Sequence, residues 1–292
     1  MSLRILLVAD VDLPSAIKLV EWILATDYEP ESEQQQHTHH QDASHGPTSW
    51  SLCCIIGPFA HRERPELVTP EERAADEGEM SAIIAQLENI VCRAVYVPGP
   101  NDPVMPAFTG RYGTPQLTGT SQNINSKVLR LLPGLCIAGY TEAPGQDADR
   151  CLAEARALCS MQPTVAHTKI AVQDSIAGTD TLLLLSCTNA ESAIPTRTAV
   201  ASGETSSGWL ENLWKRPEFV SRVGAHFWSG YTPPCSSGGD AEVLRGSAQV
   251  PQSCVPTVSL RLSGQFGAVD LVLDEATAKW RVDHVSYLQI PT

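Results

Sequence analysis

Six side chains with the chemistry of metal ligands follow apolar, strand-like segments of this chain. Carboxylate and amide oxygens suit hard divalent cations, whereas imidazole nitrogens and thiolates suit transition metals. Residues of these types can bind a divalent metal ion that activates water when a fold brings them together. The six are Asp10, Asp12, Asn101, Asp102, Cys187 and His226.

The oxygen donors among these residues also have ordinary structural roles open to them. A carboxylate at the end of a strand, as Asp10 is, also binds nearby backbone N–H groups. Asp12 precedes Leu13-Pro14 and a helical pattern, which favours a helix N-cap. The segment Asn101-Asp102-Pro103 has the composition of a turn, and the pattern favours that interpretation over a retained ligand.

The sulfur and nitrogen donors have similar alternatives. Cys187 is a candidate thiolate ligand or nucleophile, but no base neighbours it in the sequence, which favours a small buried thiol. His226 stands before Phe227 and Trp228, a setting that favours a core or interface histidine. Four more histidines lie in a Gln-rich segment that favours a solvated loop over a metal chelator. They are His37, His39, His40 and His45.

The order of apolar segments predicts an α/β fold with a mainly parallel sheet interior. Strands are expected at 4–9, 52–56, 93–97 and 181–185, with another ending near Gly224. Helices are expected around 16–24, from the Thr69-Pro70 start, where Glu72 takes the capping-box position, to about Asn89, at 149–161 and at about 207–215. Residues 29–49 read as a surface insertion. The whole chain, 1–292, is expected to form a single domain.

Two further patterns concern antiparallel pairing. Segments 127–132 and 135–139 flank a Pro133-Gly134 turn and predict a hairpin. Three closing segments, 257–262, 268–273 and 279–287, predict an antiparallel meander.

The charge and the cysteine content limit the functions that this chain can have. The chain has 20 Lys and Arg against 33 Asp and Glu, a formal charge of −13, which disfavours nucleic acid as a partner. Nine scattered cysteines indicate reduced thiols in an intracellular, cytoplasmic protein. No apolar run is long enough to predict a membrane span, and the N-terminus is unlike a signal peptide.

Five short motifs, in order, resemble the metal-binding loops of the calcineurin-like metallophosphoesterases. They are Asp10-Val11-Asp12, Gly57-Pro58, Gly99-Pro100-Asn101-Asp102, Ser186-Cys187 and Gly224-Ala225-His226-Phe227. Segments 121–125, 132–140 and 259–267 are also similar to parts of this family. The resemblance implies a four-layer α/β/β/α sandwich of two mixed sheets flanked by helices. It also implies two divalent metals (Mn, Fe or Zn) on loops at the strand ends, and hydrolysis of phosphate esters.

Most of the ligands that the resemblance implies are replaced. Pro58 stands where the bridging Asp is expected, and Pro100 stands where the bridging Asn is expected. Asn101 replaces the His that would protonate the leaving group, and Asn does not transfer protons near neutral pH. Cys187 replaces a fourth-motif His, and a one-residue slip would be needed to use Asn101 or His226 as a ligand. We therefore expect no cofactor and no catalytic residue.

Apolar side chains take the place of these ligands, namely Phe59, Phe227, Trp228 and Tyr231. Aromatic clusters of this kind form protein-binding patches, or they fill a vacated pocket. The resemblance and the replaced ligands together predict a metallophosphoesterase-fold protein with an inactive site, acting as a structural or protein-interaction subunit in a larger assembly. The alternatives are a divergent metal-dependent phosphoesterase, acting on a phosphomonoester or phosphodiester, and a small-ligand sensor.

Overall fold

The computed structural model describes residues 1–27, 50–59, 68–91, 93–103, 121–143, 146–161, 163–165, 180–189, 223–231, 258–262 and 265–288. The expected insertion at 29–49 and the expected helix at about 207–215 lie outside these residues. Among the described helices, none is both long and apolar enough to cross a membrane.

The first of two six-stranded sheets has the strand order β12-β11-β1-β2-β3-β4. Strands β1 to β4 run parallel, whereas β11 is antiparallel to β1 and β12 is antiparallel to β11. Its strands are β1 (Ser2–Ala9), β2 (Leu52–Ile56), β3 (Ala94–Val97), β4 (Ser121–Asn123), β11 (Gln265–Asp274) and β12 (Lys279–Leu288).

The second sheet has the order β10-β9-β8-β6-β5-β7 and is also mixed. Strands β6, β8, β9 and β10 run parallel, and β5 is antiparallel to β6. Its strands are β5 (Lys127–Leu132), β6 (Leu135–Thr141), β7 (Thr164–Val165), β8 (Thr181–Asn189), β9 (Val223–Tyr231) and β10 (Val258–Leu262).

The two sheets pack face to face over a shared apolar core. In β1, Ile5 and Leu7 point into this core, where they meet side chains such as Ile137 and Leu183 of the second sheet. The alternate residues Leu6 and Val8 point to the other face of the sheet, because successive side chains of a strand alternate. Burial on both faces explains why the central strands are continuous apolar runs and not alternating ones.

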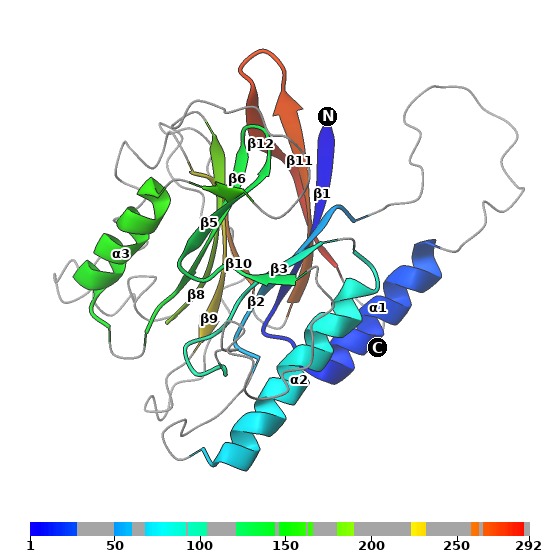
Figure 1. Cartoon of the computed structure of the whole chain (residues 1–292). Helices are drawn as coiled ribbons and strands as arrows, with labels where there is room; N and C mark the ends of the chain where they lie inside the picture. The colour runs from blue at the N-terminus through cyan, green and yellow to red at the C-terminus, as the bar shows by residue number, and fades with distance from the viewer. Residues whose placement is uncertain are drawn as a thin grey trace, which may run out of the picture.

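Helices α1 (Leu13–Asp27) and α2 (Pro70–Glu88) cover the outer face of the first sheet (Figure 1). The Asp12 carboxylate accepts a hydrogen bond from the Ser15 N–H at 2.9 Å, so Asp12 caps α1 as the sequence indicates. At α2, Thr69 and Glu72 form the expected capping box.

Helix α3 (Ala148–Ser160) lies on the outer face of the second sheet, on the opposite side of the molecule from α1 and α2 (Figure 1). Its Cys151 and Cys159 are buried against β5, β6 and β8. Asp147 caps the helix by accepting from the Arg150 N–H at 2.8 Å.

The expected α/β class is confirmed, as is the hairpin of β5 and β6. Gly134 has a φ of 75° in the turn between these strands, a conformation that glycine adopts without steric cost. The expected closing meander is confirmed for β11 and β12, which pair antiparallel in the first sheet, but it is wrong for β10, which pairs in parallel with β9 in the second sheet. Apolar content identified the three strands but carries no information about which strand each one pairs with.

Strand β12 contacts the second sheet at one end and has one irregularity in its pairing with β11. The Thr181 hydroxyl at the start of β8 donates to the Trp280 carbonyl at 3.2 Å and accepts from the Trp280 N–H at 3.1 Å. Further along, Asp270 pairs with His284 and Leu271 with Val282, so Asp283 is a bulge residue without a register partner.

Candidate active site

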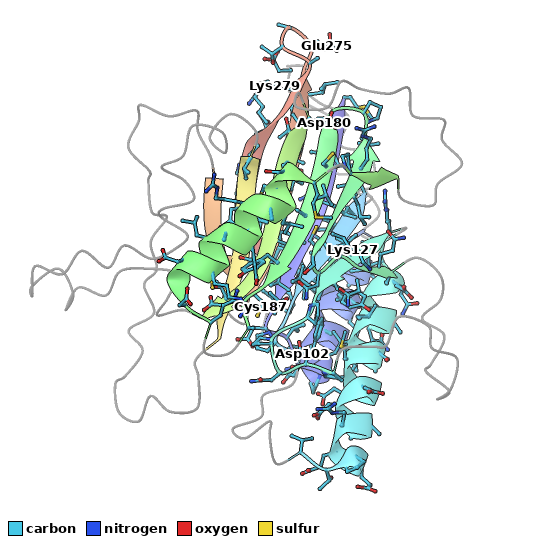
Figure 2. The ribbon with its side chains drawn as sticks, turned by 60° about the vertical axis from the view of Figure 1, so that its left-hand side comes forward. Asp102, Lys127, Asp180, Cys187, Glu275 and Lys279 are labelled. Atoms are coloured by element: carbon cyan, nitrogen blue, oxygen red, sulfur yellow. The ribbon has the colours of Figure 1, made fainter. Side chains whose placement is uncertain are left out.

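The carboxyl ends of β1, β2, β3, β6 and β8 meet at one edge of the two-sheet core, here called the carboxyl edge. Within each sheet these strands run parallel. The Thr141 hydroxyl, at the end of β6, donates to the Pro98 carbonyl, just after β3, at 2.6 Å and so joins the two sheets there. Figure 2 shows Asp102 and Cys187 at this end and Asp180, just before β8, toward the other. The structure therefore gathers four of the five loop motifs within reach of one another.

Asp102 is the best-defined charged group at the carboxyl edge, and it binds backbone amides. Its side chain is buried, with a residue exposure of 5%. One carboxylate oxygen accepts from the Gly99 N–H at 2.6 Å, and both lie within 3.0 Å of the Phe59 nitrogen. The carboxylate thus joins the loop after β2 to the loop after β3, and we call this arrangement the Asp102 clip.

The loops joined by the Asp102 clip lie too close together for side chains at their glycines. A Cβ atom at Gly57 would lie 2.3 Å from the Gly99 nitrogen, and one at Gly99 would lie 2.9 Å from the Pro58 Cα. Pro58 therefore lies against Gly99, at the position where the resemblance places a bridging carboxylate. The Asp102 N–H in turn donates to the Gly99 carbonyl at 3.3 Å, which makes residues 99–102 the expected turn, with Asn101 inside it.

Asp10 follows β1 directly and has a left-handed backbone conformation, with a φ of 54°. Its N–H donates to the Ile56 carbonyl at 3.1 Å, which holds it beside the end of β2. Left-handed backbone at residues other than glycine is uncommon and is concentrated at functional sites. The structure therefore places Asp10 at the carboxyl edge, whereas Asp12 caps α1.

Cys187 lies at the carboxyl edge but inside β8, fully buried in the core between the sheets. Burial raises the pKa of this thiol well above its ordinary value, and the negative charges of Asp102, Asp10 and Glu142 raise it further. The thiolate is the form that attacks electrophiles and binds metals. Cys187 is therefore a protonated core thiol at neutral pH, in agreement with the structural interpretation of its sequence setting.

Glu142 is a buried acidic residue of this edge that sequence reasoning missed. It is 2% exposed, and its carboxylate accepts a hydrogen bond from the Thr188 hydroxyl. The Glu142 N–H donates to the Cys187 carbonyl at 2.9 Å. The available signal was its position just after an apolar strand, as for Asp10, but the expected strand ended at Gly139 and left Glu142 in a loop.

The fifth motif requires His226 to lie at the carboxyl edge, but the structure does not place it there. It lies within β9, and its neighbours Ala225 and Phe227 point into the core between the sheets, so its imidazole points to the opposite face. Its Nε2 atom hydrogen-bonds to the Ser186 hydroxyl at 2.7 Å. Complete burial lowers the pKa of His226 to about 3, so it is neutral at ordinary pH.

Two of the expected loop motifs are therefore strand residues. Gly224 to Phe227 begin β9 and do not follow a strand, because β9 runs from Val223 to Tyr231. Ser186-Cys187 lies inside β8, which continues past the apolar run to Asn189. Sheet pairing buries these small and polar side chains, so hydropathy alone placed both boundaries wrongly.

The proposed aromatic patch is also corrected in part. Phe59 is 5% exposed and packs edge-on against Tyr96, with ring centroids 6.5 Å apart. Phe227 is fully buried between the sheets. Both are core residues of a single chain, because their large apolar surfaces find partners within it. The side chains of Trp228 and Tyr231 lie outside the described part of the structure.

The described residues do not fit the two-metal centre that the family resemblance implies. Among them, no three His, Cys, Asp or Glu side chains are grouped so that they could hold a metal ion. The Asp102 carboxylate accepts hydrogen bonds from backbone N–H groups, and the His226 side chain lies on the outer face of the second sheet, where it hydrogen-bonds to Ser186. The histidines of the 37–45 segment lie outside the described ranges.

No protein-family model matches the chain, and no curated protein matches it either. The likeness to the metallophosphoesterases therefore rests on the order of the sequence motifs alone.

Replacement of Asp102 tests the Asp102 clip. In Asp102→Ala, two buried backbone N–H groups lose their acceptor, and each unsatisfied donor costs about 1–3 kcal/mol. We expect the free energy of unfolding, measured with urea, to fall by about 2 kcal/mol or more. In Asp102→Asn the free energy of unfolding should fall less, because one acceptor oxygen remains. Asp12→Ala, which removes only an exposed helix cap worth about 1 kcal/mol, is the control. Equal losses in the two alanine variants would contradict a special role for Asp102.

The buried imidazole of His226 predicts a pH dependence of stability. Because its folded-state pKa of about 3 lies below the ordinary value of 6.5, only the unfolded chain binds this proton between those pH values. The free energy of unfolding should therefore decrease as the pH falls from 6.5, by up to about 1.4 kcal/mol per unit from this group.

The measurement compares urea unfolding of the native chain and of His226→Gln between pH 4 and pH 7. Glutamine retains a group that can bond Ser186 but does not titrate, so the variant should show the smaller slope. His284→Gln, which removes an exposed imidazole, is the control variant. Identical slopes in the native chain and His226→Gln would refute the buried, neutral state.

Proposed function

We propose that this chain is a metallophosphoesterase-fold protein with a degenerate site, acting as a structural or protein-interaction subunit. The order of packed elements supports the fold assignment: α1 and α2, the first sheet, the second sheet, then α3. This order corresponds to the four-layer α/β/β/α sandwich of that family. Carboxyl-edge loops at the ends of parallel strands are where α/β folds of this kind place their chemistry.

The single observation that carries the proposal is the Asp102 clip. A carboxylate that accepts two backbone N–H groups within 3.0 Å has its oxygens engaged in holding two loops together. Its neighbour across the clip, Pro58, has no ligand atom in its side chain, and the Cys187 thiol is held in its protonated form by burial and by the charges of nearby carboxylates. These groups stabilise the carboxyl edge and do not supply a metal-bound hydroxide.

Metal content is the first test. We expect well under one Mn, Fe or Zn per chain in protein purified without a tag, measured by elemental analysis, because the bridging ligands are replaced at Pro58 and Pro100. A variant lacking residues 34–45 is the control for weak binding by the histidine-rich segment. Two tightly held metals per chain, retained in that variant, would overturn the proposal.

A divergent metal-dependent phosphoesterase is the second candidate, and the backbone of Asp10 favours it. Left-handed backbone at a strand end is found at residues positioned for function, and the charge of Asp10 acts on the Cys187 thiol. In this reading Asp10 is the primary ligand, and the metal site uses a reduced set of oxygen donors.

Hydrolysis assays separate the two candidates. We expect negligible turnover of phosphomonoesters and phosphodiesters, because loss of a general acid alone costs a factor of about 10²–10⁴. The discriminating variant is Asp10→Ala, assayed with and without added Mn²⁺ beside Asp12→Ala as the matched carboxylate loss. Activity that survives Asp10→Ala is a contaminant, whereas metal-dependent turnover abolished only by Asp10→Ala would establish the enzyme.

The interaction role is tested at Trp228 and Tyr231. These two residues of the proposed patch remain candidates, because Phe59 and Phe227 belong to the core. A tagged Trp228→Ala, Tyr231→Ala chain should fold and lose a partner that co-purifies with the native chain, because aromatic anchors contribute on the order of 2 kcal/mol or more each. The net negative charge restricts that partner to neutral or basic surfaces. Leu24→Ala, at an exposed apolar site of α1, is the control. If the double variant unfolds, both residues are core residues, and the proposal of an interaction patch is wrong.

A further inference from the structure

We draw no further inference here: the strongest candidate, the acidic and largely exposed first half of α2 from Pro70 to Glu79, carries none because nothing in the structure shows what covers it.

Discussion

Burial of the central strands on both faces is the constraint on which this architecture depends. Each sheet presents one face to the other sheet, and the opposite face of each is covered by helices, so Ile5 and Leu6 are both fully buried although they point in opposite directions. Strand interiors built this way have little room for charge. Carboxylates are therefore concentrated where the strands end, and the carboxyl edge is the place where Asp10, Asp102 and Glu142 are found.

A carboxylate at such an edge can have a structural role that involves no metal. Where chains leave parallel strands, backbone N–H groups lose their sheet partners and need other acceptors. Asp102 satisfies two of them, from Gly99 and Phe59, while Glu142 binds the Thr188 hydroxyl. The same residue type can thus meet a structural need or a ligand need, so a carboxylate at this edge does not by itself indicate a metal site.

Local signals in the sequence were sufficient for features that depend on neighbouring residues. The capping box at Thr69, the N-cap at Asp12 and the Pro133-Gly134 turn are set by interactions within a few residues, and the structure confirms each of them. The sheet to which β10 belongs, the true ends of β8 and β9, and the burial of Phe227 depend on partners distant in the sequence. For His226 the sequence setting favoured a core or interface histidine, and the structure buries it completely, but its hydrogen-bond partner Ser186 lies on a neighbouring strand and could not be identified from adjacent residues.

The bulge at Asp283 affects how readily β12 can pair with a strand of another chain. Strand β12 is the last strand of the first sheet in the part of the chain that the structure describes, and a regular edge strand is a template for pairing with other chains. Here the bulge interrupts the spacing of backbone donors and acceptors, and Arg281 and Asp283 place an exposed ion pair on the strand with a nitrogen–oxygen distance of 2.8 Å. These two features make the described edge of β12 a poorer template for pairing with another strand than a regular edge would be.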